Sequence, residues 1–352
     1  MTQGSELKHI LMFTLPLLAG NLFQQFYNMA DAVIVGKFVG TKALAAVGST
    51  GTIMFLIYGF VVGMTAGFTV LTAQKFGAGD MQGMRRTVAG AGILSFLIGL
   101  FLTVTFMLFM KPLLHLMNTP SDIFADAYKY IMIVSGGILA QMLYNLLSSI
   151  LRALGNSKIP LYFLIISAIL NIFGDLFFVI VLKAGSNGCA ISTVLSEALC
   201  CLFCIIYIQK KVPILRLGKK WLVFDARLLK KTIAYGWASA MQQATVQMGK
   251  IAIQALVNTM GVSVAAAFAV VNRIDDFAIT PEQNIAHAMT ALMAQNKGAG
   301  KNDRMREGFR CGMILEIVYG AAVMVICQVF AGELMALFVK DEEVIGHGVI
   351  YL

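Results

Sequence analysis

Charged residues are scarce in this sequence: only 13% of its 352 residues are Asp, Glu, Lys or Arg, whereas 59% are hydrophobic. The mean hydropathy is +0.80. This composition excludes a soluble domain and predicts an all-α polytopic membrane protein. The net charge of +9 comes from Lys and Arg residues in loops between apolar runs, without an aromatic-rich basic sheet. Nucleic acid is therefore not an expected partner.

Histidine and cysteine are few and poorly placed for chemistry. A membrane-embedded enzyme would need clustered His residues or a metal-binding set of Asp residues on one side, so we predict no enzyme and no cofactor. Cys201 and Cys204 form a C-x-x-C inside an apolar helix, with no second pair or His nearby, which indicates buried thiols. The four scattered histidines are His9, His115, His287 and His347.

Long apolar runs fill most of the chain, and each can cross a bilayer as a helix. We expect nine full spans and the start of a tenth near Val344. No short apolar segment with a small-residue cleavage site stands at the N-terminus, so the first span is expected to be retained. The expected limits are 10–36, 47–73, 88–110, 127–151, 160–182, 189–208, 233–257, 264–293 and 310–332.

The connections between these runs differ in charge. If the N-terminus is inside, 19 of the 27 Lys and Arg residues lie in inside segments and 6 in outside segments. By the positive-inside rule we expect a multi-pass protein of the cytoplasmic (inner) membrane with a cytoplasmic N-terminus. The longest connection, 209–231, is strongly basic and is predicted to link a six-helix lobe at 1–208 to a second lobe at 232–352.

The sequence repeats itself at an offset of 221 residues. AQKFGAGDMQGMRR at 73–86 matches AQNKGAGKNDRMRE at 294–307, and Gly40 matches Gly261. Two independent matches at one offset indicate a duplication of six spans, in which both copies have the same orientation. Such a parallel repeat favours a transporter that rocks one bundle against the other. A full second copy needs about 220 residues and about 130 are present, so we expect the second bundle to be truncated.

The first span carries a polar stripe. Asn21, Gln24, Asn28 and Asp31 are 3, 4 and 3 residues apart, so they share one face of a helix. In lipid this face must turn toward other helices or a water-filled cavity, and a lone carboxylate there indicates function. Helix packing explains the Asn and Gln residues equally well, but packing does not need an acid. The counterpart of Asp31 in the second repeat is Ala252.

Asp175 belongs to a second stripe, in the fifth span, with Ser167 and Asn171 at i, i+4 spacing. Counted from the outer ends of their spans, Asp31 and Asp175 lie at similar depth in the outer half of the membrane. Depth alone does not prove contact, but it allows a cluster. Three further polar side chains share this depth, namely Thr193, Glu197 and Tyr130.

Such a cluster can act on a coupling ion in two ways. Neighbouring buried carboxyl groups can retain and exchange a proton near neutral pH. The same oxygens, with Asn171 and Thr193, can instead hold Na⁺, and the sequence leaves both ions open. For Thr193 alone an interhelical hydrogen bond is the favoured interpretation. Either ion supplies work, about 2.3 kcal/mol per charge for each 100 mV of membrane potential.

The second half has polar residues of another kind. Lys250 of the seventh span either faces a polar cavity or extends to the interface. In the eighth span, Arg273 is expected to form a structural ion pair with Asp275 or Asp276. The polar stripe of the seventh span consists of Ser239, Gln243, Gln247, Lys250 and Gln254.

The sequence resembles the multidrug and toxic compound extrusion (MATE) transporters over its whole length. The resemblance implies twelve spans in two six-helix bundles that open as a V, and export of organic, often cationic, compounds in exchange for Na⁺ or H⁺. It rests on LPLLAGNLFQQFYNMADAVIVGKFVG (15–40), AQKFGAGD (73–80), RALGNSKIP (152–160), NIFGD (171–175), residues 281–300 and AQNKGAGK (294–301).

The placement of the acids resembles the DinF-like branch of that family. Another branch relies on an acid in the seventh span, which here has Lys250 instead. The resemblance implies that Gln24, Tyr27 and Asn28 contact substrate, and that Asp31 and Asp175 are the metal ligands if the ion is Na⁺. The residues that match the cation site of the branch are Asp31, Asn171, Asp175, Thr193 and Tyr130.

The expected partners are small organic, cationic or amphipathic substrates and the lipid bilayer, with the chain acting as a monomer. The alternative function is a flippase for a lipid-linked saccharide of the same superfamily. A flippase would need several Arg or Lys residues in a central cavity to bind diphosphate, and only Lys250 and Arg273 are candidates. A channel is less favoured because the twofold repeat has no selectivity loop.

Overall fold

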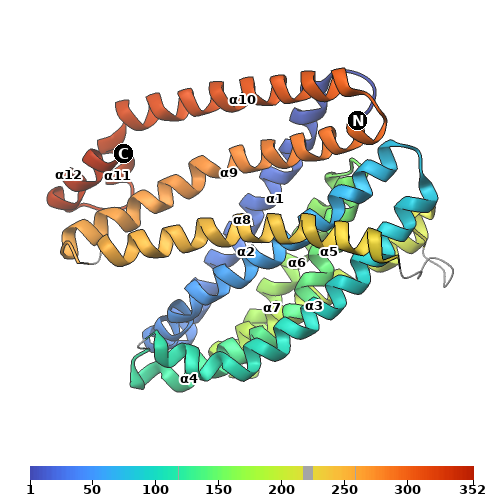
Figure 1. Ribbon diagram of the computed structural model, residues 1–352. Helices are drawn as coiled ribbons and strands as arrows, with labels where there is room; N and C mark the ends of the chain where they lie inside the picture. Colours follow the sequence, from blue (N-terminus) through green and yellow to red (C-terminus); the bar gives the residue numbers. More distant parts are fainter. Residues whose placement is uncertain (118, 217–224, 258) are drawn as a thin grey trace.

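The computed structural model describes residues 1–117, 119–216, 225–257 and 259–352, and its regular elements are all helices, as predicted (Figure 1). The N-terminal lobe consists of α1 (Glu6–Ile34) with the π-helical turn η1 (Val35–Val39), α2 (Thr41–Gly77), α3 (Met81–Leu116), α4 (Ser121–Gly136), α5 (Ile138–Ala153), α6 (Lys158–Leu176) with η2 (Phe177–Val181), α7 (Ser186–Lys211) and the short 3₁₀ turn η3 (Pro213–Leu215). The C-terminal lobe consists of α8 (Ala226–Val257), α9 (Val262–Gly298), α10 (Asn302–Val329), α11 (Ala331–Ala336) and α12 (Glu342–Tyr351).

Each of the nine predicted spans corresponds to a helix or to two consecutive helices. Within the described residues, α2, α3, α6 with η2, α7 and α10 are long and apolar enough to cross a membrane, and the bent pair α4–α5 qualifies as a sixth span. Helices α1, α8 and α9 fall short of this apolar length. α1 contacts α9, and α2 contacts α8 and α9, so these helices form the contact between the lobes.

The fourth predicted span, 127–151, is two helices rather than one. α4 and α5 meet at Gly136–Gly137 with a bend of 44°. A Cβ atom on Gly137 would meet the side chain of Val194 on α7, at 2.5 Å. The glycine pair therefore breaks the helix and admits α7 close to the break.

The predicted basic linker, 209–231, is shorter than expected. α7 continues to Lys211, and α8 begins at Ala226, because charged residues can extend a helix beyond its apolar part. Arg216 closes the end of α7 with a hydrogen bond from its Nε to the carbonyl oxygen of Gln209, at 2.6 Å. Residues 217–224 of the predicted linker lie outside the described residues.

The duplication is visible in the backbone. α2 and α9 each have 37 residues and start 221 positions apart. Each follows a glycine with positive φ, Gly40 at 118° and Gly261 at 107°. Each is followed by another such glycine, Gly79 at 71° and Gly300 at 70°. The repeated sequence therefore specifies the same helix and the same two turns in both lobes.

At one end of the molecule the two lobes touch backbone to backbone. A Cβ atom on Gly77 of α2 would overlap the backbone of Gln295 on α9, and one on Gly298 of α9 would overlap the backbone of Gln74 on α2. These contacts are reciprocal because all four residues belong to the repeat. Gln295 also donates from Nε2 to the carbonyl oxygen of Ala153, at 2.7 Å.

Toward the N-terminal end of α2 the contact with the second lobe is lost. Gly63 and Gly67 still lie against the backbone of α8, whereas a Cβ on Gly48 or Gly51 would meet nothing within 4 Å. Figure 1 shows the result, in which the red and orange helices diverge from the blue and green helices toward the end that carries α4 and α12. The predicted V shape is therefore present, with one closed end and one open end.

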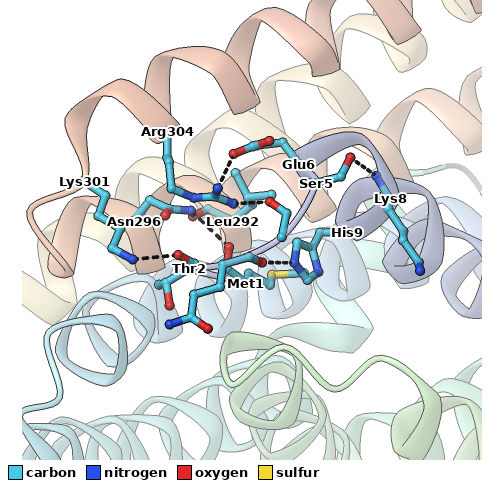
Figure 2. A network of polar contacts seen from close by, with 12 residues as sticks. Met1, Thr2, Ser5, Glu6, Lys8, His9, Leu292, Asn296, Lys301 and Arg304 are labelled. Atoms are coloured by element: carbon cyan, nitrogen blue, oxygen red, sulfur yellow. Dashed lines mark hydrogen bonds and ion pairs between the residues drawn. The ribbon is translucent and has the colours of Figure 1, made fainter.

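The first residues of the chain also fasten the closed end (Figure 2). Lys301 Nζ donates to the carbonyl oxygen of Thr2 and Arg304 Nη2 to that of Gly4, both at 2.8 Å. Arg304 Nη1 lies 2.8 Å from Glu6 Oε1, an ion pair with Glu6 largely buried. Because α1 follows directly, this segment ties the N-terminal lobe to the connection between α9 and α10.

Candidate functional site

The two predicted acids meet. Asp31 of α1 and Asp175 of α6 face each other closely enough for their carboxyl groups to interact. Asp175 is fully buried, and Asp31 is partly buried. α1 and α6 can approach because Gly20 of α1 has no side chain, so that a Cβ there would lie 3.2 Å from Leu164. Helix packing thus brings together two carboxyl groups that are 144 residues apart in the sequence.

A hydrogen-bonded network between α6 and α7 lies beside the acids. Asn171 Nδ2 donates to Thr193 Oγ1 at 3.1 Å, and Thr193 Oγ1 donates to the carbonyl oxygen of Cys189 at 3.0 Å. Ser192 Oγ donates to the carbonyl oxygen of Asn171 at 2.8 Å. The interhelical bond expected for Thr193 is therefore present, and it fixes the orientation of the Asn171 amide.

Several buried oxygens of this cluster accept no hydrogen bond of ordinary geometry from the described residues, although the side chains of Ser192 and Cys189 lie near Asp175. These oxygens are Oδ1 of Asp31, both carboxyl oxygens of Asp175 and Oδ1 of Asn171. Buried acceptors without a partner are costly, and a proton or a hard cation with a preference for oxygen would satisfy them. The half-buried Tyr130 of α4 lies within electrostatic range of both acids. All five residues predicted for the cation site are thus in one region.

The residues predicted to contact substrate precede Asp31 on α1. Gln24 Nε2 donates to the phenol oxygen of Tyr58 on α2, at 2.9 Å. Tyr27 interacts with the Gln24 side chain and is within electrostatic range of Glu197. Asn28 is exposed. The stripe therefore continues from the acid pair toward α2 and α7.

A further polar stripe, on α5, was not predicted. Gln141, Asn145, Ser149 and Arg152 are 4, 4 and 3 residues apart and share one face. Gln141 Nε2 donates to Glu197 Oε1 at 3.2 Å, and Arg152 Nη2 donates to Ser149 Oγ at 3.0 Å. The same helical spacing that marked α1 was available here. The α5 stripe was not predicted because it contains no carboxylate.

The ion pair predicted for the eighth span is wrong. Asp276 Oδ1 pairs with Lys250 Nζ of α8 at 2.8 Å, and no ion pair of Arg273 is found in the described part of the chain. α8 and α9 are consecutive helices, and Lys250 on α8 reaches Asp276 on α9, whereas the Arg273 side chain is exposed. Lys250 is thus neutralised by an acid on the neighbouring helix.

Part of the polar stripe of α8 lies against α2. Gln243 and Gln247 lie against Gly59 of α2, and the backbone of Ser239 lies against Gly63. These residues therefore form part of the contact between the lobes.

A duplicated helical bundle with buried ionisable groups between its helices is the architecture of a secondary transporter. The comparisons with known proteins give the family. The MatE family model matches residues 16–177 and 238–352, and the chain belongs to this family. It is accordingly a polytopic membrane transporter and not an enzyme, as predicted, whereas the DinF-like branch stays a prediction.

Two curated relatives come from Bacillus subtilis. Probable multidrug resistance protein YpnP is 32% identical over 100% of this chain and 78% of its own length. Probable multidrug resistance protein YoeA is 29% identical over 97% of this chain and 75% of its own length. The chain thus spans about three quarters of the length of these relatives.

Solved structures share the fold. A MOP superfamily transporter from Pyrococcus furiosus matches with a TM-score of 0.90 at 23% identity, covering 99% of this chain and 78% of the other. A multidrug resistance MATE family transporter in an outward-facing conformation gives the same TM-score, identity and coverage. At this level of identity the likeness concerns the fold alone.

Proposed function

We propose that the protein is a cation-coupled antiporter that exports organic, often cationic, compounds across the cytoplasmic membrane by alternating access. The observation that carries this proposal is the pair Asp31–Asp175, in which Oδ1 of Asp31 and both carboxyl oxygens of Asp175 are buried and accept no described hydrogen bond. The relatives YpnP and YoeA, both named as probable multidrug resistance proteins, support the export of organic compounds. Both walls of the space between the lobes come from one chain, which supports a monomer.

The coupling ion is Na⁺ or H⁺, and it acts by neutralising the acid pair. With the ion bound, the two carboxyl groups can remain together between α1 and α6. Without it, two like charges in an apolar environment repel each other strongly. α1 also touches the second lobe, where Asn21 Nδ2 donates to Asn284 Oδ1 at 3.4 Å. A movement of α1 caused by ion release is thereby transmitted to the contact between the lobes.

The distribution of charge supports an outward-facing state. The closed end of the molecule carries the basic connections, which include Lys75, Lys297, Lys301 and Arg304. By the positive-inside rule this end is cytoplasmic, and the open end faces outward. The alternative of a flippase is less favoured, because Lys250 is already paired with Asp276, and Arg152 is the single Arg or Lys that lines the described cavity between the lobes.

The test is efflux of a fluorescent cationic dye from proteoliposomes, with an imposed Na⁺ gradient and an imposed H⁺ gradient compared separately. We expect efflux under one of the two gradients, which identifies the ion. The absence of efflux under both gradients, with the protein folded, would contradict an antiporter.

A further inference from the structure

A small cavity lies between the lobes near the closed end. Its volume is about 80 Å³, and its walls come from α1 and α2, from the last turns of α5, and from α9 of the second lobe. This space accommodates a small functional group rather than a whole amphipathic compound. Its polar lining residues are Thr69, Ser149, Arg152, His287 and Thr290.

Arg152 brings a positive charge into this cavity without a neutralising acid. No ion pair of Arg152 is found among the described residues, and no lining residue is an Asp or Glu. Its guanidinium has five N–H groups, and the described hydrogen bond to Ser149 uses one of them. The half-buried Arg152 side chain lines the cavity, and none of its nitrogens is a fully enclosed atom without a partner.

The remaining polar groups offer hydrogen atoms rather than negative charge. No described hydrogen bond uses the hydroxyl hydrogen of Ser149, and His287 of α9 lies within electrostatic range of Arg152. The Thr69 and Thr290 hydroxyls already donate to the carbonyl oxygens of Ala66 and Ala286. The free donors therefore belong to Arg152 and Ser149 on one lobe and to His287 on the other.

We propose that this pocket binds an anionic group, a carboxylate or a phosphate, held by Arg152, Ser149 and His287. The planar guanidinium fits both groups through paired N–H bonds, and the mostly apolar walls strengthen such bonds because they lower the local dielectric. An anion here bridges the lobes and stabilises the closed end. It comes from an acidic substituent of the cargo, from free phosphate or from a lipid headgroup. Only the first source rests on the proposed export function.

The test measures binding to the purified full chain with three probes. Inorganic phosphate and benzoate are titrated by calorimetry in neutral detergent, and nanodiscs of phosphatidylglycerol are compared with nanodiscs of phosphatidylcholine by thermal unfolding. We expect at least one probe to act saturably, and the responding probe identifies the source. Arg152→Gln is expected to weaken that binding about tenfold or more, since charged hydrogen bonds are lost. Arg310→Gln, at an exposed arginine outside the pocket, is the matched control and keeps wild-type affinity.

His287→Leu removes the donor of the second lobe and provides an independent check if Arg152→Gln does not fold. It is expected to weaken binding about threefold. Failure of all three probes to bind, or wild-type affinity in both variants, would overturn the pocket. Arg152-dependent binding without any dye efflux would support the pocket and contradict the exporter. Dye efflux with Arg152-independent binding would contradict the pocket alone.

Discussion

Where the N-terminal lobe has Asp31, the C-terminal lobe has Ala252, 221 residues further along the chain. The two lobes share the length of α2 and α9 and the glycine turns at their ends. Among the described residues, the fully buried acid Asp175 belongs to the first lobe, whereas the neighbouring acids Glu282 and Glu316 of the second lobe are partly exposed. The second lobe neutralises its own charge instead, through Lys250 and Asp276. The two repeats thus share backbone features, whereas their ionisable groups differ.

The acids of the two lobes also differ in solvent exposure. The side chain of Asp276 is 46% exposed and lies 2.8 Å from a lysine, whereas Asp175 is 0% exposed and accepts no described hydrogen bond. The charges of Lys250 and Asp276 already neutralise each other, whereas a buried carboxyl without a partner needs a proton or a cation. We therefore assign ion coupling to the N-terminal lobe alone.

Neutralising the acids should have the largest effect. Asp31→Asn and Asp175→Asn each remove a carboxylate from the coupling pair, so ion-driven dye efflux should fall to the rate of protein-free liposomes. Asp276→Asn removes an acid of the second lobe and should keep efflux within about twofold of wild type, because that pair is exposed. Wild-type efflux in both N-terminal variants would refute the one-sided arrangement.

Filling the closed end should have the next largest effect. Gly77→Ala places a methyl group against the backbone of Gln295, and overpacking of this kind costs about 1–3 kcal/mol. The free energy of unfolding and the yield of a disulfide engineered across the closed end should both fall. Gly48→Ala, in the same helix at the open end, meets nothing within 4 Å and serves as the control. Equal effects of both substitutions would show that the contact between the repeats does not hold the lobes together.

Detaching the N-terminal segment should have a moderate effect. Arg304→Ala removes the ion pair with Glu6 and the hydrogen bond to Gly4, at a cost of about 1–2 kcal/mol, since Glu6 is largely buried. Hydrogen exchange of residues 1–8 should accelerate. Arg306→Ala, at an exposed arginine two residues away, should leave the exchange unchanged. Unchanged protection in Arg304→Ala would exclude this contact as the fastening of the closed end.

The smallest effect should come from the turn after α2. Asp80 caps α3 by accepting from the Gly83 amide at 2.8 Å and pairs with Lys75 at 2.9 Å, whereas its repeat counterpart Lys301 bonds to Thr2. The Lys75 hydrogen bond lowers the pKa of Asp80, so its stabilising contribution is present above its pKa in the unfolded chain, about 3.9. That contribution is lost as the pH falls through the lowered value.

Asp80→Asn should therefore cost about 0.5 kcal/mol near neutral pH, a small amount because the pair is well exposed. The measurement is the denaturation midpoint as a function of pH. The difference between wild type and variant should shrink in acid, and a difference that grows in acid would contradict the pairing.

The sequence was informative where a pattern is local. Apolar runs correctly predicted the helices, and the 221-residue offset predicted the matching helices and glycine turns. The similar depth of Asp31 and Asp175 allowed a cluster without predicting their contact. Each signal needs only helical geometry and the rule that polar faces avoid lipid.

Features that depend on a distant partner were not predictable in the same way. The bend at Gly136–Gly137 requires the approach of α7, and the pairing of Lys250 with Asp276 depends on how α8 lies against α9. The backbone contact between Gly77 and Gln295 likewise exists only once the lobes are packed together. A glycine or a lysine in the sequence does not reveal which segment will lie beside it.

Direct measurement of ion binding tests the central claim most simply. Equilibrium binding of ²²Na⁺ and, in parallel, proton uptake reported by a pH indicator are measured on the purified wild type, Asp175→Asn and Asp276→Asn. The account predicts that one of the two ions binds to the wild type and to Asp276→Asn, and that this binding is lost in Asp175→Asn. Equal ion binding by all three proteins would contradict the assignment of coupling to the N-terminal lobe.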